Sequence, residues 1–242
     1  MGEALLLGVI TSGSLMIGAF LALRFNISSK IIGLIMAFGV GALISSVCFE
    51  LVEEAFTESQ NIVIVVIGLF AGALTYFFGD MFIDKIGGKN RKNMNGTDSN
   101  IGLPILLGTV LDGVPESIVI GISTIGGSGL STAMVAAVFL SNIPEALSSS
   151  KGLLASGWKK TSIIGLWLVV IAMSVLSALF GYFVFADVSG VIKAFILSFA
   201  GGAILTMLAD TMIPEAYRET GKLTGLAVVL GFSMAYLLTI ME

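Results

Sequence analysis

Residues 101–124, IGLPILLGTVLDGVPESIVIGIST, form an apolar run that contains two acids and two prolines. Such a run is long enough to cross a bilayer, because roughly 20 apolar residues span the hydrocarbon core. Asp112 and Glu116 lie four residues apart and would share one face of a helix. Pro115 cannot donate a backbone hydrogen bond, which frees the carbonyl oxygen of Leu111 in such a helix. The stretch therefore predicts a membrane-spanning helix with oxygen atoms gathered on one side.

The rest of the chain has the same apolar character. Of its 242 residues, 56% are hydrophobic and 12% are charged, and its mean hydropathy is +1.04. Soluble domains carry about 25% charged residues. These values predict an all-α membrane protein, an eight-helix transmembrane bundle in a single domain. The expected spans are 3–23, 31–56, 61–86, 101–124, 130–152, 161–185, 189–217 and 223–241, with a flexible polar connection at 87–100.

The composition also excludes several classes of function. The chain has no histidine, which excludes Ser-His-Asp hydrolases and histidine-ligated zinc sites. Its one cysteine, Cys48, cannot form an internal disulfide. With 12 basic and 16 acidic residues, it lacks the basic surface that nucleic-acid binding needs. We expect no nucleic-acid partner and no prosthetic group, and the bilayer as the main surroundings.

The basic residues predict the orientation in the membrane. Eleven of the 12 fall in or beside loops on one side of the expected spans, and only Lys193 falls on the other. Cytoplasmic loops are enriched in Lys and Arg. The pattern predicts a multi-pass protein of the cell membrane with both termini outside.

Two internal matches indicate repeats. Residues 41–56 match residues 202–217 at an offset of 161, and residues 112–116 match residues 141–145 at an offset of 29. In the expected topology, the two segments of each pair cross the membrane in opposite directions. Inverted repeats of this kind are common in secondary transporters.

Acidic residues within the spans are the candidate functional groups, because each costs at least about 2.5 kcal/mol on insertion scales. Without Lys or Arg at comparable depth, such carboxylates must be protonated and hydrogen-bonded, hydrated, or bound to a cation. The predicted cation site comprises Asp112, Glu116, Asn142 and Glu145, with Ser141 a weaker addition. Asp210 also lies deep in its span, whereas Glu50 and Glu215 lie nearer to helix ends. For Asp210 and Glu50, a role in an access path and simple solvation at a helix end both stay open.

These motifs resemble those of the ZIP family of metal transporters. Residues 112–117 resemble the family pattern HNxPEG, residues 141–146 a related pattern, residues 210–215 the pattern HExxPE, and residues 50–55 the pattern HLLPEA. The resemblance implies eight spans, external termini and a metal centre between spans four and five. Every histidine of these patterns is replaced here. Gly113 stands at the asparagine position and span six has no carboxylate, so the resemblance implies one complete metal site.

The expected function is transport of a divalent metal into the cytoplasm, with the ion as substrate. Oxygen ligands favour manganese and iron, while zinc and cadmium stay candidates. Two alternatives stay open: a proton-coupled transporter of another small substrate, and a metal sensor that does not transport. An intramembrane aspartyl protease is disfavoured, because Gly79-Asp80 lacks the first glycine of the Gly-x-Gly-Asp setting. The protein is therefore not expected to be an enzyme, and a homodimer stays open.

Overall fold

The computed structural model describes residues 1–88, 102–125 and 132–241, and every regular element in these ranges is a helix. The predicted all-α fold class is confirmed. The elements are α1 (Gly2–Arg24), α2 (Ser29–Ser46), η1 (Val47–Val52), α3 (Glu53–Ser59), α4 (Ile62–Lys85), α5 (Gly102–Ser123), α6 (Thr132–Ala155), α7 (Lys160–Val184), α8 (Gly190–Met207), η4 (Leu208–Met212), α9 (Ile213–Thr220) and α10 (Leu223–Met241).

Seven helical segments of the described chain are long and apolar enough to cross a membrane. Two of them are composite: α2, η1 and α3 form one continuous segment, and α8, η4 and α9 form another. The eighth long helix, α6, is not among the seven. Its second half holds a series of buried polar residues, Ser141, Asn142, Glu145 and Ser148–Ser150. The polar side chains in the second half of α6 are therefore enclosed by the protein.

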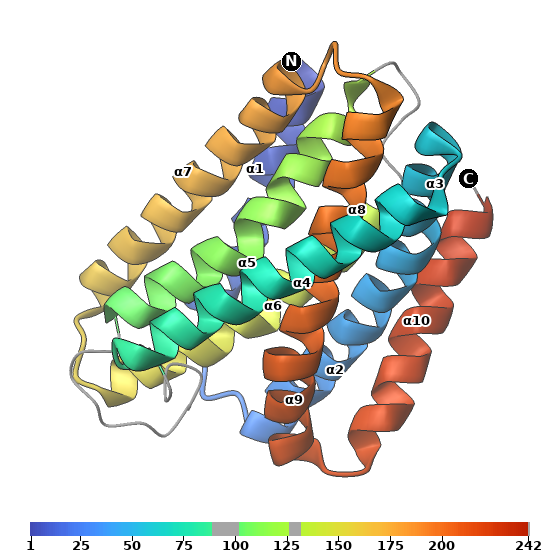
Figure 1. The fold of residues 1–242 in the computed structure, drawn as a ribbon. Helices are drawn as coiled ribbons and strands as arrows, with labels where there is room; N and C mark the ends of the chain where they lie inside the picture. Colours follow the sequence, from blue (N-terminus) through green and yellow to red (C-terminus); the bar gives the residue numbers. More distant parts are fainter. Residues whose placement is uncertain (89–101, 126–131, 242) are drawn as a thin grey trace.

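The helices form two groups by their contacts. In the first bundle, α1 packs against α6 and α7, and α5 packs against α7. In the second bundle, α2 packs against α9 and α10, and α8 packs against α3 and α4. The two bundles meet mainly where α2 contacts α6 and α5 contacts α8. Figure 1 shows both chain termini at the same end of the molecule.

Glycines at matching positions show how the two repeats pack. A Cβ atom at Gly231 of α10 would overlap the carbonyl oxygen of Phe38 in α2. A Cβ at Gly72 of α4 would overlap the carbonyl oxygen of Phe199 in α8. Phe38 and Phe199 are separated by the repeat offset of 161 residues. Small residues allow helix backbones to approach closely within membranes, so both repeats use the same contact.

The two π-helical segments occupy matching places in the repeats. η1 begins at Val47 and η4 begins at Leu208, again 161 residues apart. α2 and α8, which precede them, run in opposite directions in Figure 1. A π-helical turn inserts an extra residue and rotates the side chains that follow it. The structure thus carries the inverted repeat expected from the sequence, together with a local distortion that the sequence does not reveal.

The loop expected at 87–100 lies almost entirely outside the described residues. Only Gly87 and Gly88 are described, and they continue the end of α4 as a turn.

Candidate metal site

A small cavity of about 10 Å³ lies inside the first bundle. This is close to the space that one water molecule needs, so it suits a single small ion or a water. All four helices of the bundle contribute polar side chains to it: Thr11, Ser12, Thr109, Glu116, Ser117, Asn142, Glu145 and Ser174. No lysine or arginine lines it. The cavity therefore offers only oxygen ligands, two of them from carboxyl groups.

The two glutamates are held at equivalent positions by a repeated motif. Pro115 precedes Glu116 within α5, and Pro144 precedes Glu145 within α6. A proline inside a helix leaves the carbonyl oxygen four residues earlier without its helical donor. Glu116 is 4% exposed and Glu145 is 6% exposed. Two buried carboxyl groups from separate helices thus share one cavity.

Asn142 connects the cavity to α1. Its Nδ2 donates a hydrogen bond of 3.1 Å to the carbonyl oxygen of Thr11. Because the amide nitrogen makes this bond, the oxygen Oδ1 is the atom of Asn142 that can act as a ligand. Asn142 accordingly makes the interhelical hydrogen bond that an amide in a membrane bundle often makes, and it also lines the cavity.

Asp112 lies one helical turn before Glu116 but does not line the cavity. The Tyr76 hydroxyl of α4 donates a hydrogen bond of 2.6 Å to its Oδ1. Within the described residues, no three His, Cys, Asp or Glu side chains are grouped to hold a metal ion. The structure therefore brings together Glu116, Asn142 and Glu145 of the predicted set, and places Asp112 at the contact between the two bundles.

The other predicted site residues also lie away from the cavity. Ser141 is buried and donates to the carbonyl oxygen of Val138 in its own helix. A Cβ at Gly39 of α2 would lie 3.0 Å from the Cα of Ser141, so this serine packs where the bundles meet. Glu50, half-buried in η1, accepts a hydrogen bond of 3.0 Å from Thr239 of α10. Asp210 is exposed in η4.

The structure adds several hydroxyl groups that the sequence analysis did not single out. Thr11 and Ser12 come from α1, Thr109 and Ser117 from α5, and Ser174 from α7. Span six, which has no carboxylate, thus contributes the oxygen of Ser174. The sequence indicates these hydroxyl groups only weakly as ligands, because an isolated Ser or Thr in an apolar span usually forms a hydrogen bond within its own helix.

Glu215 is a second buried acid at the contact between the bundles. It is 4% exposed, and one of its carboxyl oxygens accepts a hydrogen bond from the Ser148 hydroxyl. Glu215 belongs to α9 and Ser148 to α6, so this bond joins the second bundle to the first. Glu215 was expected near a helix end, and the structure shows that it is buried.

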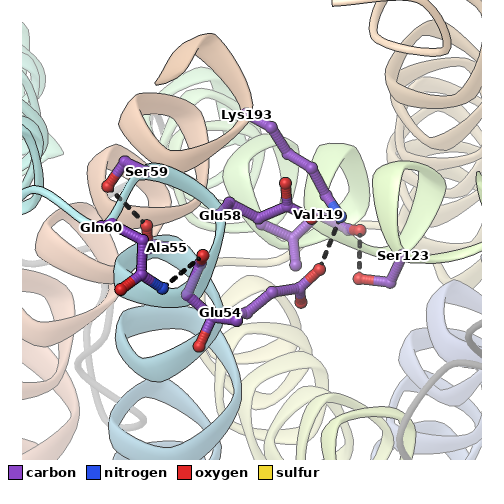
Figure 2. Close-up of polar contacts among 9 residues, drawn as sticks. Glu54, Ala55, Glu58, Ser59, Gln60, Val119, Ser123 and Lys193 are labelled. Carbon is purple, nitrogen blue, oxygen red and sulfur yellow. Dashed lines mark hydrogen bonds and ion pairs between the residues drawn. The ribbon is translucent and has the colours of Figure 1, made fainter. Parts of the chain in front are cut away.

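At the end that carries the termini, Lys193 forms ion pairs with two glutamates. Its Nζ lies 2.7 Å from a carboxyl oxygen of Glu54 and 2.8 Å from one of Glu58. Figure 2 shows the three side chains converging from α3 and α8. Lys193 is the basic residue that departs from the charge distribution of the sequence, and its charge is compensated here.

These features define a class: a multi-pass membrane protein made of inverted repeats, with a small acidic cavity inside one of its two bundles. No family model matches the chain. The chain is 25% identical over 198 residues, 80% of its length, to an Arabidopsis thaliana protein named "Putative zinc transporter". It covers 32% of that relative, about a third of its length. This similarity supports the ZIP-type resemblance of the motifs.

Proposed function

We propose that the protein transports divalent metal ions across the membrane, towards the cytoplasm, by way of the cavity between Glu116 and Glu145. One observation carries the proposal: two buried carboxyl groups line a space of about 10 Å³, and the other oxygen atoms of its side chains are neutral. Two carboxylates balance the charge of one divalent ion, which removes the cost of burying them. The name of the Arabidopsis relative points to the same kind of substrate.

The ligands of the ion would be Glu116, Glu145 and Oδ1 of Asn142, with hydroxyl groups completing the shell. Carboxylates and neutral oxygens are hard ligands and suit manganese or iron, although zinc also accepts carboxylates. The small volume favours an ion that has lost most of its water. We therefore expect several divalent metals to compete for one site.

Transport requires the site to open alternately to the two sides. The cavity is lined only by α1, α5, α6 and α7, so a bound ion would move with the first bundle. The Tyr76–Asp112 and Ser148–Glu215 hydrogen bonds join this bundle to the second. Both would have to break if the bundles shift relative to each other. We propose that these contacts stabilise the conformation described here.

Metal uptake into proteoliposomes tests the function. Mn²⁺, Fe²⁺, Zn²⁺, Co²⁺ and Cd²⁺ would be offered singly and in competition to the wild type, to Glu116→Ala plus Glu145→Ala, and to Glu53→Ala. Glu53 is an exposed control carboxylate. We expect uptake by the wild type and by Glu53→Ala, and background flux for the double variant.

The remaining outcomes bear on the alternatives. Metal binding without uptake would contradict transport and favour a sensor. Proton flux without metal binding would favour a transporter of another small substrate. Unchanged uptake by a folded double variant would contradict the proposed site.

A further inference from the structure

A groove of about 320 Å³ lies at the end of the molecule opposite the termini, between the end of α1 and the end of α6. Its polar lining consists of Arg24, Asn26 and Lys151. Its apolar lining includes Phe25 and Leu154. We call this feature the basic groove. It is separate from the acidic cavity, which shares no lining residue with it.

The basic groove carries a positive charge. Arg24 is exposed, and Lys151 is half-buried and donates a hydrogen bond of 2.7 Å to the carbonyl oxygen of Ile27. Lys160 donates one of 3.0 Å to the carbonyl oxygen of Leu23, which lines the groove. In the described parts of the chain, none of these three cations forms an ion pair.

The surrounding sequence explains this imbalance. Residues 18–49 and 146–186, which include α6 from Ala146 onward and the loops around the groove, contain no Asp or Glu. Each lysine ammonium has three donors, so Lys151 keeps donors for a ligand after bonding to Ile27. Arg24 offers a planar fork that matches phosphate oxygens. The groove can therefore bind an anion with several charge-assisted hydrogen bonds.

The position of the groove indicates which anion. Arg24 is the last residue of the membrane-spanning helix α1, so the groove lies where the hydrocarbon core gives way to water. The exposed Phe25 and the half-buried Leu154 offer apolar surface beside the cations. We propose that the basic groove binds one anionic phospholipid, with its phosphate against Arg24 and Lys151 and its acyl chain against the apolar wall. Basic pockets between helices on the cytoplasmic side are suited to such headgroups.

The groove also includes part of the connection between the two bundles. Phe25 and Asn26 belong to the short linker that joins α1 of the first bundle to α2 of the second. A lipid bound there would hold the linker against α6 through Lys151. The site would therefore stabilise the folded protein, whether or not the protein moves metal.

Binding would be measured on the purified full-length protein in neutral detergent, by native mass spectrometry and by thermal unfolding. The additions are phosphatidylglycerol, phosphatidylcholine and inorganic phosphate. The variants are Arg24→Gln, Lys151→Gln and Lys222→Gln. Lys222 is a control, because it is exposed at the same end but lies outside the groove.

We expect phosphatidylglycerol, and not phosphatidylcholine, to remain bound and to raise the unfolding temperature. Arg24→Gln and Lys151→Gln should each weaken phosphatidylglycerol binding about fivefold, the effect of one basic residue near an anionic lipid surface, and Lys222→Gln should not. Arg24→Gln decides the matter if Lys151→Gln does not fold, since the Arg24 side chain is exposed. Equal retention of both lipids, unchanged binding by Arg24→Gln, or the same stabilisation by inorganic phosphate alone would overturn the proposal.

Discussion

The Tyr76 hydroxyl donates a hydrogen bond of 2.6 Å to Oδ1 of Asp112 and thereby joins α4 of the second bundle to α5 of the first. Tyr76 is 1% exposed and Asp112 is 4% exposed. Thr211 of η4 is a further polar neighbour of the Tyr76 hydroxyl. A buried carboxyl group is thus held at the contact between the bundles, one helical turn from the proposed metal site.

Tyr76→Phe removes this hydrogen bond while keeping the ring. We expect the variant to lose about 1–3 kcal/mol of stability, because a buried carboxyl oxygen loses a hydrogen-bond donor. The measurement is thermal or denaturant unfolding in detergent. Tyr236→Phe is the matched control, because Tyr236 is 37% exposed and contacts Phe49 through its ring. Equal stability of Tyr76→Phe and the wild type would contradict the importance of this contact.

Two glycines of α10 test the close packing of the repeats. A Cβ at Gly231 would overlap the carbonyl oxygen of Phe38, whereas a Cβ at Gly225 would meet nothing within 4 Å. Gly231→Ala should destabilise the protein by about 1–3 kcal/mol through overpacking. Gly225→Ala should be neutral, or stabilising by up to about 1 kcal/mol, because alanine favours a helix. Similar unfolding temperatures for the two variants would contradict the described packing of α10 against α2.

Acid should weaken metal uptake. Carboxylates bind a metal only after losing their protons, so protons and metal compete for Glu116 and Glu145. We expect the half-saturating metal concentration to rise when the pH is lowered from 7.5 to 5.5, with the maximal rate less affected. Proteoliposome uptake at several metal concentrations measures both quantities. A half-saturating concentration that does not change with pH would argue against carboxylate ligands.

The orientation predicted from the charges can be tested with single cysteines. In a Cys48→Ser background, Asp187→Cys should react with a membrane-impermeant maleimide applied to intact cells, and Lys222→Cys should react only after the cells are opened. Asp187 is exposed in the connection between α7 and α8, and Lys222 is exposed in the connection between α9 and α10. The reverse labelling pattern would show that the protein is inserted in the opposite direction.

The sequence predicts the helices well because each apolar run must satisfy its own backbone hydrogen bonds in lipid. The bounds of α1, α5 and α10 differ from the expected spans by at most one residue. The π-helical segments could not be predicted, because a single-residue insertion leaves no apolar periodicity of its own. α6 was expected as an apolar span. Because of its buried polar residues, it is the one long helix of the described chain that is not apolar enough to be counted among the seven membrane-spanning segments.

The candidate site was predicted only in part. Glu116, Asn142 and Glu145 line one cavity, as the repeated Pro-Glu motif suggested. Asp112 was expected beside Glu116 on the basis of their spacing, but residues four apart on a helix differ in direction by about 40°. Tyr76 lies in an otherwise apolar span, so nothing in the sequence connected it with Asp112. This rotation and this partner separate Asp112 from the cavity in the conformation described.

Anomalous diffraction tests the central claim most directly. Crystals of the protein grown with Zn²⁺ would be measured on both sides of the zinc absorption edge, for the wild type and for Glu116→Gln plus Glu145→Gln. The account predicts a wild-type peak between Glu116 and Glu145, with carboxylate oxygens at about 2.0–2.2 Å, and its loss in the double variant. Zinc peaks confined to the exposed acids, with none in the cavity, would contradict it.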